Sequence, residues 1–279
     1  MLAIAPARSY AIWFSQRVGS TLLSQALEDT GIAGRPREWF HAASPADVLA
    51  KYGVATPHEL REVLWREGTT PNGVLGVKYG VGVSSPHHAL ETSLFASVAS
   101  ESQDPDGRKT WEAFFPSCSH IFMTRRNKFR LAVSWWRAIK SAQWHRLDPR
   151  RASSAVDRPP GLDTGAGERV PDLADQYVHE AIEHLFIEAN LREVAIQEQF
   201  DRWGIVPLTV VYEDFVASFE PTVRGVLDFL HIPGRHDVAI PAPAFERLAD
   251  DVSEDWYQRF RRERTAMLKE PVSAHRPRG

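Results

Sequence analysis

The sequence predicts an α/β fold, a single domain with a central parallel sheet flanked by helices. Short apolar runs alternate with segments that carry apolar residues at helical spacing, as in β-α-β units. The run Val206–Tyr212 is apolar enough to be a parallel strand buried on both faces. The 279 residues, 43% of them hydrophobic, are enough for one large domain. We expect this domain to span residues 1–269.

Four strands are expected in the sheet. They cover Ser9–Phe14, Val74–Val77, His120–Thr124 and Val206–Tyr212. A turn, Gln16–Gly19, follows the first strand and leads into a helical stretch. Leu23 and Leu27 lie on one apolar face of that stretch, and Gly31 is expected to end it.

Three further helices are expected in the second half of the chain. Asn127–Trp144 carries Phe129 and Val133 at helical spacing, and Leu173–Phe200 is a longer periodic segment. Pro221–Leu230 is expected to begin at its proline, because proline is favoured in the first turn of a helix.

Two segments are predicted to be irregular. Residues 148–172 hold several prolines and glycines, so we predict a flexible loop insertion there. Loops of this length inside a domain are often functional, and we hypothesise that this one borders a substrate site. Residues 270–279 are predicted to form a disordered tail.

Composition excludes several classes of protein. The 33 basic side chains are balanced by 36 acidic ones, which argues against a nucleic-acid binder. No stretch approaches the roughly 18 consecutive apolar residues of a membrane span. The N-terminus resembles a first strand more than a signal peptide, so a cytoplasmic location is expected. The single cysteine, Cys118, excludes a disulfide framework and a cysteine-based metal cluster.

The turn after the first strand has the character of an anion site. A loop between a strand and a helix aims free backbone N–H groups at one point, at the positive end of the helix dipole. Glycine allows close approach of the backbone, and arginine and hydroxyl side chains add donors. The alternative is an ordinary turn with a Ser/Thr cap. The residues expected to bind the anion are Gln16, Arg17, Val18, Gly19, Ser20 and Thr21.

This turn is not a Walker A loop. That motif requires G-x-x-x-x-G-K-[ST], and the turn lacks both the first glycine and the lysine. No acidic residue is convincingly placed to hold magnesium. A P-loop-type nucleotide kinase is therefore a disfavoured alternative.

A second basic motif follows the strand His120–Thr124. Arg126 comes directly after the strand, and Ser134 is two turns into the next helix. Arg130, Ser134 and Arg137 share one helical face. An arginine and a hydroxyl from one unit of this kind suit a phosphate group; the alternative is a solvated basic face.

The two motifs together, SQRVGSTLL and RNKFRLAVS, resemble those of sulfotransferases that use 3′-phosphoadenosine 5′-phosphosulfate (PAPS). A wider set of segments, from Tyr10 to about Arg261, resembles bacterial trehalose 2-sulfotransferases. In order, these segments read SQRVGSTLL, GIAGRPREWF, GVKYG, TRRNKFRLAVSWWRA, VVYEDF, TVRGVLDFL and SEDWYQRF.

The resemblance implies a P-loop-like sulfotransferase fold and a PAPS site without a metal. In such enzymes the first loop holds the 5′-phosphosulfate, which assigns Arg17 a catalytic role. The 3′-phosphate would be held by Arg126 and Ser134, with Arg247 as an extra contact from a C-terminal segment. Val18 stands where the family usually has serine, which removes one hydroxyl donor and leaves the backbone cradle. The resemblance also favours a homodimer.

The segment GIAGRPREWF supplies the expected catalytic base. By its place in the motif, Glu38 matches the family's catalytic glutamate, which would take the proton of the acceptor hydroxyl. Arg35 and His41 are expected to contact the acceptor, and His41 is the competing base. Without the resemblance, a surface glutamate paired with Arg37 would be the preferred interpretation. Two aromatic residues next to Glu38 are expected to anchor the segment in the core.

The sequence therefore predicts a sulfotransferase that moves a sulfuryl group from PAPS to a hydroxyl of a carbohydrate, with PAP as the other product. The acceptor would be trehalose or another glycan or glycoconjugate. A non-catalytic nucleotide-binding module is the second alternative, although the joint presence of Arg17, Glu38, Arg126 and Ser134 speaks against it.

Overall fold

The computed structural model describes residues 4–42, 44–80, 107–145, 173, 175–245 and 248–268. The predicted loop 148–172, the predicted tail 270–279 and Arg247 lie outside the described residues. The chain divides into two compact units. The first unit comprises Met1–Arg126 with Asn190–Ala244, and the second comprises Asn127–Ala189 with Phe245–Gly279.

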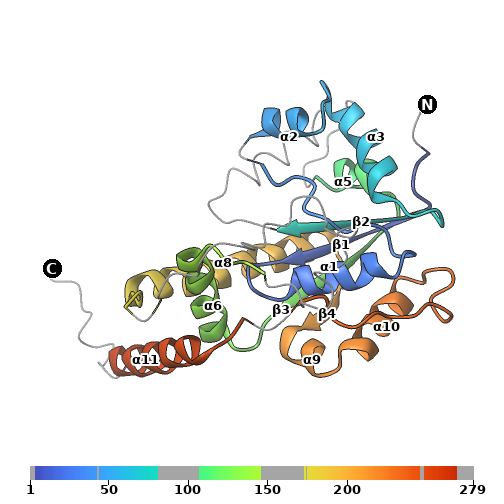
Figure 1. Ribbon diagram of the computed structural model, residues 1–279. Coiled ribbons are helices and arrows are strands. Elements are labelled where there is room, and N and C mark those ends of the chain that lie inside the picture. The colour runs from blue at the N-terminus through green and yellow to red at the C-terminus, as the bar shows by residue number, and fades with distance from the viewer. Residues whose placement is uncertain are drawn as a thin grey trace. The chain divides into compact units, whose positions relative to one another are not determined.

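The first unit contains a parallel sheet in the order β2-β1-β3-β4 (Figure 1). Its strands are β1 (Arg8–Phe14), β2 (Val74–Gly80), β3 (Cys118–Thr124) and β4 (Leu208–Val211). The prediction of an α/β fold with a central parallel sheet flanked by helices is confirmed. All four carboxyl ends meet at one edge, and β1 has β2 on one side and β3 on the other. The loop after β1 therefore lies at the topological switch point, where α/β proteins bind ligands.

One face of the sheet carries an aromatic core. Trp13 on β1 packs against α3 (Pro57–Gly68), α5 (Arg108–Phe114) and the later half of α8 (His179–Trp203) through a buried cluster. The indole N–H of Trp13 donates to His120 Nδ1 at 2.9 Å. Burial lowers the pKa of His120 to about 4, so its imidazole is neutral near pH 7 and can accept this bond.

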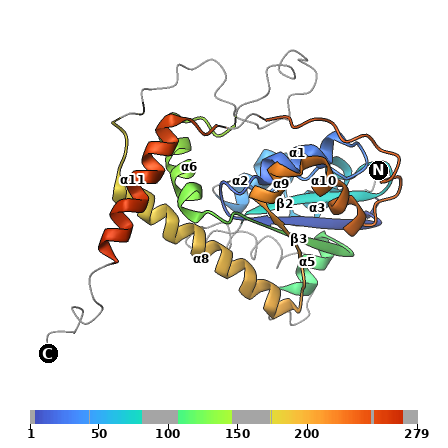
Figure 2. The same cartoon turned by 90° about the horizontal axis from the view of Figure 1, so that it is seen from below.

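The opposite face is covered by α1 (Ser20–Asp29) and α10 (Phe219–Phe229), and α5 and the end of α8 lie across the sheet from them (Figure 2). Tyr10 points to this side and donates to the carbonyl of Ala33 at 2.6 Å. Because both faces are covered, β1 is buried along nearly its whole length. As predicted, α1 ends before Gly31, which has a left-handed backbone with φ of 71°.

The second unit is helical. It contains α6 (Lys128–Ser141), α11 (Asp251–Met267) and the first part of α8. Phe129 of α6 lies 5.3 Å, between ring centroids, from both Phe186 of α8 and Phe260 of α11. Among the described residues, no helix is both long and apolar enough to cross a membrane.

The structure corrects three predicted boundaries. The predicted strand Val206–Tyr212 shortens to β4, an edge strand that pairs with β3 alone among the described strands. Val206 lies two residues before β4 and is 92% exposed. Tyr212 begins a separate helix, α9 (Tyr212–Ala217). Helix α10 begins two residues before Pro221, whose missing N–H costs nothing in the first turn. Helix α8 begins at His179 and ends at Trp203, later than the predicted Leu173–Phe200.

Helices α2 and α3 are among those that were not predicted, although the sequence carries their start signals. Helix α2 (Pro45–Lys51) is capped by Ser44, whose side chain accepts from the N–H of Asp47. Helix α3 begins with Thr56 and Glu59 in a capping box. Both have proline in the first turn, and their apolar faces are too short to show a clear period.

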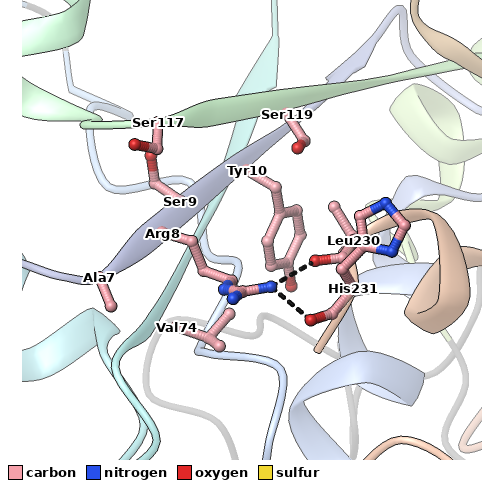
Figure 3. A pocket seen from close by; sticks show the side chains of 9 residues that line it. All are labelled: Ala7, Arg8, Ser9, Tyr10, Val74, Ser117, Ser119, Leu230 and His231. Atoms are coloured by element: carbon pink, nitrogen blue, oxygen red, sulfur yellow. Dashed lines mark hydrogen bonds between the residues drawn. The ribbon is translucent and has the colours of Figure 1, made fainter. Parts of the chain in front are cut away.

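At the amino-terminal edge of the sheet, the charged side chain beside a cavity is bonded to the backbone of the protein itself. A cavity of about 240 Å³ there is lined by residues at the starts of three strands (Figure 3). Arg8 donates to the carbonyls of Leu230 and His231 at the end of α10, which occupies its guanidinium. At the start of β3, burial raises the pKa of the Cys118 thiol to about 12, which keeps it protonated.

Candidate active site

The turn after β1 forms a concave loop at the carboxyl edge of the sheet. Arg17 and Gly19 both have left-handed backbones, with φ of 65° and 83°. Alternating conformations of this kind point successive N–H groups into one concavity. Gly19 is required for a second reason, because a Cβ atom there would lie 2.7 Å from a ring carbon of Tyr212. The loop leads into the first turn of α1, where the free N–H groups favour an anion.

The predicted loop residues divide by exposure. Val18 and Ser20 are buried, whereas Gln16, Arg17, Gly19 and Thr21 are partly exposed. Val18 can therefore serve a ligand only through its backbone N–H, as expected when a hydrophobic residue replaces serine.

Lys78 on β2 completes the loop from a neighbouring strand. Its ammonium nitrogen lies 2.8 Å from Thr21 Oγ1 and 2.6 Å from Glu38 Oε1. It also lies 4.9 Å from the centre of the Phe14 ring. The loop itself has no lysine, so this positive charge comes from outside the predicted motif. The sequence reasoning missed Lys78, and its only signal is a lysine inside an otherwise buried strand.

Glu38 is placed by an extended segment that runs beside β2. Arg37 forms a parallel bridge with Val77, and the N–H of Lys78 donates to the Arg37 carbonyl at 3.0 Å. The following residues, Trp39 and Phe40, are buried, which confirms that the aromatic pair anchors the segment. The Glu38 side chain remains 38% exposed, so a substrate can reach its carboxylate.

The structure does not show the pairing of Glu38 with Arg37 that was considered above. Arg37 pairs with Glu28 on α1 at 2.5 Å, and Glu38 pairs with Lys78 instead. His41 Nδ1 lies 3.7 Å from Glu38 Oε2 and is 72% exposed, so the two candidate bases are neighbours. Arg35 is exposed, and its guanidinium donates to the Glu67 carbonyl in the last turn of α3 at 2.9 Å.

The ends of β3 and β4 contribute further charged groups at the same edge. Arg125 stacks on Tyr212 at 4.7 Å and donates to the carbonyl of Arg17 at 3.5 Å. The side chain of Arg126 is 60% exposed and pairs with Asp214 at 2.5 Å, while its N–H donates to Glu213 at 2.9 Å. Arg125 and Tyr212 were not among the predicted site residues. Their contacts join positions far apart in the chain, which local motifs do not reveal.

Ser134 belongs to the second unit, whereas Arg126 ends the first. The joint role of these two residues therefore stays a prediction. On the helical face of Ser134, Arg130 pairs with Glu254 at 2.7 Å and Arg137 pairs with Asp250 at 2.7 Å. Arg137 is buried, so this face is not the solvated basic face considered as the alternative.

Two adjacent residues of α8 contact the loop, and neither was predicted. Arg192 donates to the side-chain oxygen of Gln16. Glu193 accepts from Ser15 Oγ at 3.4 Å and from Thr124 Oγ1 at 3.0 Å. In the part of the chain that the structure describes, no group of three His, Cys, Asp or Glu side chains could hold a metal ion.

Comparison with known proteins adds to this geometry. The model of the family described as Stf0 sulphotransferase matches residues 9–263, which includes the loop, Glu38, Lys78, Arg126 and Ser134. A trehalose 2-sulfotransferase of Mycobacterium tuberculosis is 28% identical over 285 residues, covering 92% of this chain and 95% of the relative. A trehalose 2-sulfotransferase of Mycolicibacterium smegmatis is 27% identical, covering 91% and 95%.

Solved structures show more distant similarity. A sulfotransferase from Alicyclobacillus acidocaldarius is 12% identical with a TM-score of 0.43, covering 95% of this chain and 97% of that one. The sulfotransferase domain of an olefin synthase from Synechococcus PCC 7002 is also 12% identical, with a TM-score of 0.38 and coverage of 92% and 95%.

Proposed function

The chain belongs to the Stf0 sulphotransferase family and is a transferase, and from this premise we propose that it moves a sulfuryl group from PAPS to a hydroxyl of a carbohydrate. One geometric observation carries the proposal. A single ammonium group, that of Lys78, contacts both the exposed carboxylate of Glu38 and the hydroxyl of Thr21 in the anion-binding loop. A candidate base for the acceptor and a candidate site for the donor are thereby neighbours.

The loop has the donor set that a phosphosulfate needs. Backbone N–H groups at the start of α1, the Thr21 hydroxyl and the Lys78 ammonium all offer protons to an anion. Arg17, partly exposed within the loop, adds a guanidinium. These groups fit the 5′-phosphosulfate of PAPS, which supplies the activated sulfuryl group when it is bound.

Glu38 would act on the acceptor. A sugar hydroxyl is a weak nucleophile, so Glu38 takes its proton as the new oxygen–sulfur bond forms and the bond from sulfur to the phosphate oxygen breaks. The electron pair of the broken bond stays on the leaving phosphate. The proton ends on Glu38 and then passes to solvent. No metal is needed for this balance, since charge moves from one oxygen to another.

Lys78 and Arg17 would stabilise the charge that grows on the leaving phosphate. A fixed cation that faces developing charge in a partly buried site is worth more than the same cation in water. Lys78 also neutralises Glu38 before reaction, which keeps the two carboxylate oxygens in place beside the loop.

Arg126 and Ser134 would hold the 3′-phosphate, as the family resemblance implies. The Arg126 side chain is exposed at the carboxyl edge of the sheet and is held by Asp214. An incoming phosphate would compete with Asp214 for this guanidinium. Remote binding of this kind would orient the reacting sulfuryl group. Arg247 remains an additional proposed contact.

The acceptor is proposed to be trehalose or a related glycan or glycoconjugate. Two relatives that cover nearly the whole chain are trehalose 2-sulfotransferases. Arg35 and His41 are the proposed acceptor contacts, of which His41 lies beside Glu38. We also propose a homodimer, from the family resemblance, which light scattering of the purified protein would test.

A sulfuryl-transfer assay tests the function directly. The protein would be incubated with PAPS and a panel of sugars that includes trehalose, and mass spectrometry would detect the added sulfuryl group. Sulfated sugar with release of PAP is the expected result. Thermal-shift measurements with PAP, ATP and GTP would separate the alternatives. Stabilisation by ATP and not by PAP would favour a kinase, and PAP binding without transfer would favour a non-catalytic module.

A further inference from the structure

Helix α8 contacts the anion-binding loop through two adjacent residues, Arg192 and Glu193. Successive side chains on a helix point about 100° apart, and each of these two side chains contacts a different residue of the loop. Arg192 contacts Gln16, and Glu193 contacts Ser15, the residue directly after β1. The second carboxylate oxygen of Glu193 accepts from Thr124, the last residue of β3. One side chain therefore joins the ends of two neighbouring strands.

The burial of Glu193 makes this contact costly. Its exposure is 7%, and it is the one buried carboxylate among the residues that the structure describes. Burying a carboxylate is unfavourable unless hydrogen bonds compensate for the lost contact with water. Its two hydrogen bonds to the ends of neighbouring strands are therefore a contribution that an apolar side chain would not make.

The loop contains a strained position that needs support. Arg17 has a φ of 65°, a left-handed conformation that is unfavourable for a residue with a side chain. Such conformations persist where the surroundings determine them, and they are common at ligand sites. Side-chain contacts hold the backbone both before Arg17 and at its carbonyl. Ser15 and Gln16 are bound to α8, and the Arg17 carbonyl accepts from Arg125.

We infer that Glu193 is a positioning residue that sets the shape of the anion-binding loop before any ligand arrives. Its two oxygens hold Ser15 and Thr124 at once, and Thr124 is followed by Arg125, which holds the Arg17 carbonyl. Glu193 thereby holds the residue two positions before Arg17 and the residue that precedes Arg125, and these contacts keep Arg17 in its left-handed conformation. The N–H groups of the loop then point at one spot without a further ordering cost. Only the identity of the anion rests on the proposed function.

Hydrogen exchange of the ligand-free protein tests this inference. The variants Glu193→Gln and Thr124→Val each remove part of the network, and Glu198→Gln is the control, an exposed glutamate on the same helix. Amides of residues 16–21 should exchange about three- to tenfold faster in the first two variants, the scale of one lost hydrogen bond. Exchange in β1 and β3 should be unchanged. Glutamine retains one acceptor oxygen, so Glu193→Leu should have a larger effect than Glu193→Gln.

Two outcomes would overturn the inference. Unchanged loop exchange in both Glu193→Gln and Thr124→Val would show that the network does not shape the loop. Equal acceleration in the loop and in β1 would show that Glu193 stabilises the whole sheet and does not act on the loop. If Glu193→Leu fails to fold, as judged by circular dichroism, the glutamine and Thr124 variants still decide.

Calorimetry with PAP connects the inference to the proposed function. Glu193→Gln should weaken PAP binding about three- to tenfold, with the KM for the acceptor sugar unchanged, because the loop serves the donor. If the wild-type protein binds no PAP, the proposed function fails, and the exchange result still decides the role of Glu193. Wild-type PAP affinity in Glu193→Gln, together with a loosened loop, would show that the loop's shape does not control binding.

Discussion

The ion pair Lys78–Glu38 in the first unit and the pair Arg137–Asp250 in the second have nearly the same geometry. Their nitrogen–oxygen distances are 2.6 Å and 2.7 Å. In each pair the cation is buried, with side chains 8% and 6% exposed, and the carboxylate is partly open, at 38% and 45%. Distance and burial alone therefore do not separate a pair that we propose to be catalytic from a structural one.

The two pairs differ in what their other atoms contact. Asp250 caps α11, because its second oxygen accepts from both the N–H and the hydroxyl of Ser253. Glu38 lies in an extended segment, and its second oxygen is directed toward the exposed ring of His41. Lys78 in turn contacts Thr21 of the anion-binding loop. The function of an ion pair is thus indicated by the partners of its remaining atoms.

Replacing the carboxylate of the first pair should have the largest effect. Glu38→Gln keeps the size of the side chain and removes its ability to accept a proton, so sulfuryl transfer should fall about 10²–10⁴-fold. PAP affinity, measured by calorimetry, should stay near the wild-type value. His41→Ala is the matched variant and should retain most activity. Near-normal turnover in Glu38→Gln with loss of activity in His41→Ala would make His41 the base.

Replacing the cation of the same pair should have a somewhat smaller effect. Lys78→Met removes the charge that faces both Glu38 and the loop, and the transfer rate should fall about 10²–10³-fold. Unlike Glu38→Gln, it should also weaken PAP binding. Lys78→Arg, which keeps the charge, should recover part of both. Equal PAP affinity in Lys78→Met and wild type would remove Lys78 from the donor site.

A third substitution tests the donor site away from either pair. Arg126→Ala should weaken PAP binding by roughly 1.5–3 kcal/mol, the scale of a charge-assisted contact to phosphate. Ser134→Ala should have a smaller effect. Calorimetry would measure both, and wild-type affinity in Arg126→Ala would contradict the assignment of the 3′-phosphate.

Breaking the second pair should change stability and leave PAP affinity intact. Asp250→Ala removes a helix cap and the partner of buried Arg137, so the free energy of unfolding should fall by about 1–2 kcal/mol. Glu254→Gln, which breaks the more exposed pair with Arg130, should cost about 0.2–1 kcal/mol. Urea unfolding would measure both. Loss of PAP affinity in Asp250→Ala, with the fold intact, would contradict the structural role.

The contribution of Asp250 to the free energy of unfolding should decrease as the pH falls. Burial acts to raise the pKa of Asp250, but the hydrogen bonds from Arg137 and Ser253 together outweigh it, so the pKa is lowered. The carboxylate therefore contributes stability above the pKa it has in the unfolded chain, and this contribution is lost as the pH falls through the lowered value. The difference between wild type and Asp250→Asn should narrow as the pH falls.

Prediction from sequence located the local features of the candidate site, the turn after β1 and the anchored segment that carries Glu38. The loop Ser15–Thr21 and the segment around Glu38 are continuous stretches, and their residue types indicate their surroundings. Lys78 was missed because its partners come from a different part of the chain and its strand gives only an apolar pattern. The shared face of Arg130 and Arg137 follows from helical spacing, but their acidic partners lie 124 and 113 residues later. No local pattern contains that information.

The position of β2 at the edge of the described sheet has a consequence for engineering. The loop proposed to bind the donor follows β1, a central strand, and it contacts Arg125 after β3, Tyr212 at the start of α9 and two residues of α8. Glu38 lies on a segment attached to the outer side of β2, and that segment together with α2 and α3 forms one continuous insertion between α1 and β2. Such an insertion can be exchanged as a block if the apolar residues that it buries against the sheet, Trp39, Phe40, Leu60 and Leu64 among them, are kept. Grafting residues 35–68 from a relative should therefore transfer acceptor preference while PAP affinity stays that of the host.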